Sequence, residues 1–298
     1  GALVVTAGHL DLMTNSQNLS VKGGITLANA ASAKLKTAST ITLSGSLTLG
    51  AASTFTATGG TVTFNSDNPQ TVTINTSNQR FNNVTINNTA GTTARNTVTF
   101  VTNAFTVLGN VTVTQGSWDA TTNSIATSHV GSITVADSAL ARFLTAANLT
   151  LSGSITVKPA AAFTQTAGTT NLNGTSQTLS GSMTINNLQK VITSADTLSF
   201  YPGYTYTISN IENMNGLSSN AKLTVQSSIS GQRWTIAPGS KKTVQLLALK
   251  DSFNLYGTTK SLTCLDCTNN GNNEGWGFES SPTVNVSSTS PSGGGGGG

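Results

Sequence analysis

The sequence predicts an all-β protein, and within that class a right-handed parallel β-helix in which short strands stack turn upon turn. Three observations support this prediction: a polar but uncharged composition, a long internal duplication, and short alternating triplets at a nearly constant step. Of the 298 residues, 52 are Thr, 36 Ser and 30 Asn, whereas only 24 are charged. Thr favours strands, and Asn, Ser and Gly are poor helix formers, so the composition disfavours a large helical domain.

The duplication is the strongest signal in the chain. Residues 23–65 align without a gap to residues 131–173, 108 positions later, with 21 identities in 43 positions. The best-matched stretch sets residues 41–49 against residues 149–157. Because compositional bias alone rarely holds one register over such a length, we interpret the match as a real duplication, with several smaller units in each half.

The smaller units are triplets in which Thr lies between two apolar residues, as in Val84, Thr85 and Ile86. In a strand this alternation points the apolar side chains to the core and Thr to the solvent. The strands that begin at Ile41, Val62, Val84 and Phe105 follow one another at a nearly constant step, which fits one coil of a β-solenoid. We therefore expect aliphatic columns, such as Val62 over Ile41, to fill the interior.

Tandem β-sandwiches are the alternative fold, because they too use short alternating strands. Sandwiches and barrels are built from hairpins, however, and the tight hairpin signals of this sequence are few: Asn173-Gly174 and Asn215-Gly216 are the main ones. The nearly constant step between strands also outlasts any single hairpin. Both features favour the parallel β-helix.

Four regions follow from the pattern. Residues 1–22 form an N-terminal strand or cap, 23–190 the duplicated solenoid, 191–278 an irregular closing β subdomain, and 279–298 a flexible Ser/Pro/Gly-rich linker. The apolar residues Leu3, Val4 and Val5 are a candidate donated strand that pairs with the exposed edge of a neighbouring copy.

Two segments resemble the repeat-bearing surface proteins of bacteria, which carry β-helical stalks and are loosely similar to filamentous-haemagglutinin-like and adhesin-like proteins. One segment is residues 60–74 running on to 81–88, with an echo at 168–187. The other is the Asn/Gly-rich stretch 266–278, which closes on Gly-Trp-x-Phe. The resemblance implies a secreted protein that is exposed at the cell surface, and it implies no catalytic residue.

The distribution of charge and the cysteine content limit the kinds of partner and of metal site that the chain can have. The net charge of +4 is spread thinly with no Lys/Arg run, which argues against nucleic acid, and no apolar stretch is long enough for a membrane span. Cys264 and Cys267 form a single C-x-x-C, and the two histidines, His9 and His129, lie far away in sequence. We therefore expect a short disulfide rather than a zinc site, and no metal or cofactor.

Parallel β-helices include enzymes that cleave polysaccharides, and such cleavage by hydrolysis needs a pair of nearby carboxylates. Glu274 and Glu279 are the one close pair in sequence, and Asp119 with Asp137 are slightly less than one coil apart. We interpret them as isolated loop carboxylates, predict no catalytic residue, and expect that the chain is not an enzyme.

Aromatic residues offer a candidate binding site. Tyr204, Tyr206 and Trp234 are candidates for a sugar-stacking platform, but packing inside the cap is the preferred interpretation. The sequence as a whole predicts an extracellular structural protein, either a rigid solenoid segment of a cell-surface adhesin or a subunit of a filament or sheath that self-associates. The alternative is a β-helix that binds or cleaves carbohydrate, with a polysaccharide or a host or neighbouring cell surface as partner.

Overall fold

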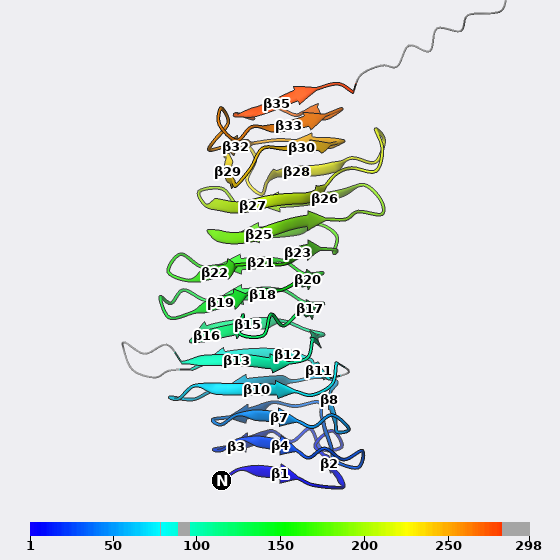
Figure 1. Ribbon diagram of the computed structural model, residues 1–298, viewed down its shortest axis with the longest axis vertical. Helices are drawn as coiled ribbons and strands as arrows, with labels where there is room; N and C mark the ends of the chain where they lie inside the picture. The colour runs from blue at the N-terminus through cyan, green and yellow to red at the C-terminus, as the bar shows by residue number, and fades with distance from the viewer. Residues whose placement is uncertain (78, 89–95, 282–298) are drawn as a thin grey trace, which may run out of the picture.

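The computed structural model describes residues 1–77, 79–88 and 96–281. Within them the chain is all-β, and its parallel strands stack into a β-solenoid of about 12 turns (Figure 1). The described residues contain no helix that could cross a membrane. Because every pairing between the named strands is parallel, the β-helix is confirmed over tandem β-sandwiches.

Each of the first eight turns contributes three strands, one to each of three stacks that we name faces 1, 2 and 3. Faces 1 and 2 belong to one 20-stranded sheet and meet at β25, and face 3 is a separate 12-stranded sheet. Face 1 comprises β1 (Leu3–Val5), β4 (Ile25–Leu27), β7 (Leu47–Leu49), β10 (Gln70–Ile74), β13 (Thr97–Thr102), β16 (Ser117–Ala120), β19 (Arg142–Thr145), β22 (Ala162–Gln165), β25 (Met183–Lys190), β27 (Thr205–Met214), β29 (Trp234–Pro238) and β32 (Ser252–Asn254).

Face 2 comprises β2 (His9–Asp11), β5 (Lys34–Thr37), β8 (Thr54–Ala57), β11 (Arg80–Phe81), β14 (Phe105–Val107), β17 (Thr127–His129), β20 (Leu149–Leu151) and β23 (Thr169–Leu172). Face 3 comprises β3 (Leu19–Val21), β6 (Ile41–Leu43), β9 (Thr61–Phe64), β12 (Asn83–Asn87), β15 (Val111–Gln115), β18 (Ile133–Val135), β21 (Ile155–Val157), β24 (Gln177–Ser180), β26 (Asp196–Phe200), β28 (Leu223–Ser227), β31 (Leu247–Leu249) and β34 (Thr268–Asn269). A third sheet, at the C-terminal end, comprises β30 (Lys242–Gln245), β33 (Leu262–Leu265) and β35 (Trp276–Glu279).

The register of face 3 matches most of the predicted column. Ile41 pairs with Val62, and Val62 pairs with Val84, as the nearly constant step predicts. The next partner of Val84 is Val111 and not Phe105, which begins β14 on face 2. The prediction for Phe105 is wrong because successive turns contain different numbers of residues. A constant number of residues therefore leads to a strand on another face.

The alternation of the triplets sets the inside and the outside of the solenoid. Val84 and Ile86 are buried and Thr85 is partly exposed, and the same pattern recurs along the three faces. Aromatic rings also stack through the core: Trp118 lies 5.1 Å from Phe143, which lies 5.2 Å from Phe163 in a nearly parallel plane. Such offset stacks fill the interior and stabilise it beyond the burial of apolar surface area alone.

Glycine allows one corner of the coil to stack closely. A Cβ on Gly153 would lie 2.3 Å from the carbonyl oxygen of Gly131, and a Cβ on Gly131 would lie 2.3 Å from that of Gly109. No side chain fits in that space, so this corner has to be built from glycine.

The duplicated units lie on different faces. Strand β6 on face 3 corresponds in sequence to β20 on face 2, and β4 on face 1 corresponds to β18 on face 3. The same sequence serves either face because each is a three-residue strand with two inward apolar side chains.

The stacks continue through residues 191–278, the region predicted to be a separate closing subdomain. Face 3 runs from β24 through β26, β28 and β31 to β34, and face 1 runs from β25 through β27 and β29 to β32. What changes is strand length: β25 has eight residues and pairs with both β22 and β23, so that two faces merge into one strand. Residue 190 therefore marks a change of cross-section and not a break in the sheets.

Candidate functional site

The cysteine pair forms the predicted disulfide. Cys264 lies in β33 with its side chain in the core, and it is bonded to Cys267 just beyond the strand. In the part of the chain that the structure describes, no group of three or more His, Cys, Asp or Glu residues could hold a metal ion.

Tyr206 and Trp234 do not form an exposed sugar-stacking platform, because they pack in the core, as the preferred interpretation of the sequence expects. Both side chains are fully buried, and Phe200 packs between them, with its ring 4.1 Å from that of Trp234 and 4.8 Å from that of Tyr206. The Tyr206 hydroxyl lies within hydrogen-bond distance of the carbonyl oxygens of Leu179 and Tyr201, at 2.8 and 2.9 Å, and burial raises its pKa well above the ordinary value. Tyr204 is half-buried. The physical reason is that the alternation of the strand points Tyr206 inward, where its ring contributes most to the apolar packing of the core.

The candidate donated strand lies in this chain's own sheet. Leu3, Val4 and Val5 form β1 and pair in parallel with Ile25, Thr26 and Leu27 of β4. Donation to a neighbour would have to break this pairing, whereas the other edge of β1 has no partner strand among the described residues.

The carboxylates weighed as an enzyme pair do not come together. Asp119 on face 1 faces Leu144 in the next turn, and Asp137 accepts a hydrogen bond from the backbone N–H of Ala160. Glu274 forms an ion pair with Arg233 on the surface.

His129 is a core residue. It lies in β17 on face 2, with its ring 5.6 Å from that of Trp118 and 6.1 Å from that of Phe143. Its Nε2 is 3.0 Å from the hydroxyl of Thr127. Burial lowers the pKa of His129 from 6.5 to about 3, so the ring is neutral in the folded protein.

Face 3 carries an unbroken outward row of hydroxyl groups, which we name the hydroxyl column. Its members occupy matching positions in successive strands, and all are partly exposed except Ser20, which is exposed: Ser20, Thr42, Thr63, Thr85, Thr112, Thr134, Thr156 and Ser180. Strands in a sheet are about 4.8 Å apart, so the seven steps extend for about 34 Å. The corresponding row on face 2 is interrupted by charge at Lys36 and Arg80.

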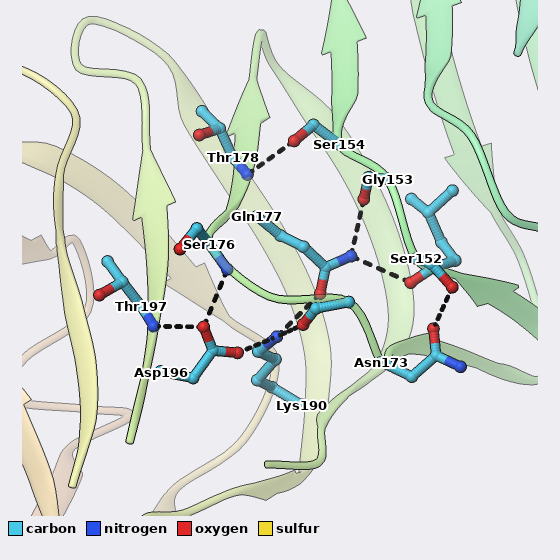
Figure 2. Close-up of polar contacts among 12 residues, drawn as sticks. Ser152, Gly153, Ser154, Asn173, Ser176, Gln177, Thr178, Lys190, Asp196 and Thr197 are labelled. Atoms are coloured by element: carbon cyan, nitrogen blue, oxygen red, sulfur yellow. Dashed lines mark hydrogen bonds and ion pairs between the residues drawn. The ribbon is translucent and has the colours of Figure 1, made fainter. Parts of the chain in front are cut away.

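A buried polar cluster lies where faces 1 and 2 merge, and we name it the Lys190 cluster, after Lys190 with Gln177 and Asp196. Lys190 ends β25 and is fully buried, Gln177 begins β24 and is 1% exposed, and the Asp196 side chain at the start of β26 is 7% exposed. The Lys190 Nζ lies 2.8 Å from Gln177 Oε1 and 2.7 Å from Asp196 Oδ2, and it also donates to the Gly174 carbonyl (Figure 2).

Each member of the Lys190 cluster has further partners. Asp196 Oδ1 accepts the backbone N–H groups of Ser176 and Thr197, and Gln177 Nε2 donates to the carbonyls of Leu151 and Gly153 (Figure 2). Burial raises the pKa of the Asp196 carboxyl, but these hydrogen bonds and the charge of Lys190 outweigh burial and hold the pKa below its ordinary value. Asp196 is thus an ionised carboxylate.

The Lys190 cluster was not predicted from the sequence, although the sequence contains one signal of it. Met183, Ile185 and Leu188 are inward positions of β25, and Lys190 continues that row. A charge at an inward position calls for buried partners, because an unpaired buried charge is costly. What the sequence does not show is which partners the turns bring there.

Comparison of the chain with protein-family models, with curated proteins and with solved structures finds no match. The fold and the geometry of the sites are therefore the basis for its function. On that basis the chain is a parallel β-solenoid of about 12 turns, with a hydroxyl column on one face and a buried Lys190 cluster at the change of cross-section.

Proposed function

We propose that this chain is a rigid structural segment of an extracellular, cell-surface protein and that it acts without catalysis. The observation that carries the proposal is the continuous stacking of faces 1 and 3 from the first turn to the last. At about 4.8 Å per turn, about 12 turns make a rod about 55 Å long in which each turn is held by the next.

Two further features support an extracellular setting. The Cys264–Cys267 disulfide is of the kind that persists in oxidising compartments. The outward side chains are mostly Thr, Ser and Asn, with 24 charges in 298 residues, so the surface gains its solubility from uncharged polar groups.

The proposal is tested by the shape of the purified chain and by the location of the protein on the cell. Small-angle scattering of the purified chain is expected to give a rod profile of about this length, and electron microscopy then separates single rods from end-to-end filaments. Antibodies against the chain are expected to label intact producing cells. A globular scattering profile, or labelling only after the cells are opened, would overturn the proposal.

A second candidate function, favoured by the hydroxyl column, is lateral binding of a polysaccharide along face 3. A flat row of hydroxyl groups without charge presents donors and acceptors at one regular spacing, which suits a polymer with repeated hydroxyl groups. The test is retention of the chain on insoluble polysaccharides, with a double variant, Thr112→Lys with Thr134→Lys, expected to abolish it.

The matched control puts the same change on face 2, where Thr106 and Thr150 lie two turns apart in the corresponding outward row. Thr106→Lys with Thr150→Lys is expected to leave retention unchanged. Equal loss in the two double variants would show a general effect of charge and would remove face 3 as the binding surface.

A further inference from the structure

The Lys190 cluster brings an amine, a primary amide and a carboxylate into contact inside the solenoid. The Lys190 Nζ lies 2.8 Å from the amide oxygen of Gln177 and 2.7 Å from Asp196 Oδ2. Reactants held in contact in a fixed orientation react as though at very high concentration, and exclusion of water removes the competing hydrolysis. An amine and an amide in contact are the reactants of an amide exchange.

We propose that Lys190 and Gln177 form an intramolecular amide cross-link in the mature protein, with Asp196 acting as the general base. Asp196 takes a proton from the Lys190 ammonium, and the free Nζ attacks Cδ of Gln177. The new Nζ–Cδ bond forms as the Cδ–Nε2 bond breaks, Asp196 returns the first proton to Nε2, and Asp196 then takes the second proton that Nζ loses on becoming an amide. Nitrogen leaves as one ammonia, which carries that second proton away from Asp196 as ammonium, and no oxidant, reductant or further reactant is needed.

The charges decide the role of each group. Asp196 accepts three hydrogen bonds and is ionised, and a carboxylate anion resists attack by a nucleophile but can accept the proton of the ammonium that it contacts. Gln177 is neutral at its carbonyl carbon and is therefore the electrophile. A lysine amine becomes a nucleophile once it has lost its proton.

The solenoid holds the amide still for this step. Gln177 Nε2 donates to the carbonyl oxygens of Gly153 at 2.6 Å and Leu151 at 3.0 Å, which fixes the plane of the amide. The same two acceptors stabilise the positive charge that develops on Nε2 as it leaves.

The cross-link would close a loop of the chain between residues 177 and 190, joining β24 on face 3 to the end of β25. Closing a loop covalently restricts the unfolded chain and resists separation of the strands it joins. The linkage lies where the cross-section changes, and it stands independently of the proposed rod function.

The methionines of this chain allow a direct test. Met183 lies between Gln177 and Lys190, and the other methionines are Met13 and Met214. Cyanogen bromide cleaves after methionine, so it separates fragment 14–183 from fragment 184–214 unless a cross-link joins them. For the reduced wild-type protein we expect the two fragments to stay joined, at the sum of their masses less one ammonia.

The alternatives give distinct results. A simple ion pair leaves two separate fragments of unaltered mass, and that result would overturn the proposal. A bond between Lys190 and Asp196 lies wholly within fragment 184–214, which would separate and weigh one water less, and that result would also overturn it. Loss of ammonia at an Asn-Gly pair such as Asn173-Gly174 does not join the fragments.

Two variants sharpen the result. Asp196→Asn keeps the shape of the side chain but removes the base, so we expect its fragments to separate. Gln70→Leu changes the corresponding glutamine of the first repeat and is expected to leave the fragments joined. Separation in Gln70→Leu, or joining in Gln177→Leu, would show that Gln177 is not the partner.

Discussion

The two copies of the duplicated unit place a glutamine at matching sequence positions, each at a corner of the coil, and they complete its hydrogen bonds differently. In the first copy Gln70 Nε2 donates to the carbonyls of Leu43 and Gly45, at 3.1 and 2.7 Å. In the second, Gln177 Nε2 donates to the matching carbonyls of Leu151 and Gly153. The two corners are alike in this half of the amide although they lie on different faces.

The other half of each amide differs. Gln177 Oε1 accepts a hydrogen bond from Lys190, whereas Gln70 Oε1 is buried and has no hydrogen-bond partner among the described residues. The second copy therefore contains a buried cation, and with it Asp196. The difference shows that the carbonyls at a solenoid corner fix the Nε2 side of the amide. The Oε1 side has no partner set by the corner and can acquire one, as it does with Lys190.

The largest effect is expected where a carboxylate enters the core without the partners that Asp196 has. Val84→Asp places a charge in the apolar interior of face 3, where Val84 is 1% exposed. We expect a loss of at least about 4 kcal/mol in the free energy of unfolding, or no folding. Urea unfolding followed by circular dichroism measures it.

The matched control for this change is Thr85→Asp, one residue along the same strand on the partly exposed side. It is expected to cost far less, because its carboxylate stays hydrated. Equal losses at the two positions would contradict the inward and outward assignment of β12.

The Lys190 cluster is expected to show the next largest effect. Relative to the chain in which the Lys190–Gln177 amide has not formed, Lys190→Ala removes the cation that faces Asp196 and leaves a buried carboxylate short of a partner, at a cost of about 3–5 kcal/mol in unfolding free energy. Changing both, as Lys190→Met with Asp196→Asn, is expected to recover part of that loss. A double variant no more stable than Lys190→Ala would show that the ion pair is not the source of the effect.

His129 is expected to make stability depend on pH. Its folded pKa, about 3, lies below the unfolded value of 6.5, so below pH 6.5 the unfolded chain binds a proton that the folded chain does not. Stability is therefore complete above pH 6.5 and falls as the pH drops toward 3, by about 2 kcal/mol between pH 6.5 and 4.5. Melting temperatures across this range measure the slope.

The matched variant is His129→Leu, since Val107 and Leu151 are the apolar neighbours of His129 in the adjacent turns. It is expected to flatten the slope, whereas a change at the exposed His9 is expected to leave the slope unaltered. A slope unchanged in His129→Leu would assign the pH dependence to other groups.

The two corner glutamines give a smaller, comparative effect. Gln177→Leu removes the Nε2 donor from the Gly153 carbonyl and one of two donors from the Leu151 carbonyl, and it leaves the Lys190 Nζ with only Gly174 and Asp196 as acceptors. We expect a cost of about 1–3 kcal/mol of unfolding free energy. Gln70→Leu removes two hydrogen bonds but also a buried oxygen without a partner, so we expect it to cost about 1 kcal/mol less. Thermal unfolding of both variants measures the difference, and equal costs would remove the contrast between the corners.

The sequence was sufficient to predict the parallel β-helix and the inward position of Val62 over Ile41, because strand alternation is local. It failed at Phe105, because the step from Val84 to its partner Val111 is longer than the earlier steps, and it did not reveal that β25 pairs with strands of both face 1 and face 2. Tyr206 shows the limit for sites, since alternation fixes which residues share a side of the strand but not which side faces the core. The Lys190 cluster depends on three segments that only the coiling brings together.

The smallest effect is expected at the outward threonines. Thr85→Ser keeps the hydroxyl of the hydroxyl column and removes one methyl group from a partly exposed position, so unfolding free energy should change by no more than about 0.5 kcal/mol. Thr184 is the matching residue of the second copy and lies on face 1, where it is also partly exposed. Thr184→Ser is expected to be equally mild, because outward positions on either face touch few neighbours. Thermal unfolding of the two variants measures this, and a clear loss in one of them would show that the faces are not equivalent and that the methyl group of the affected threonine contributes to the packing.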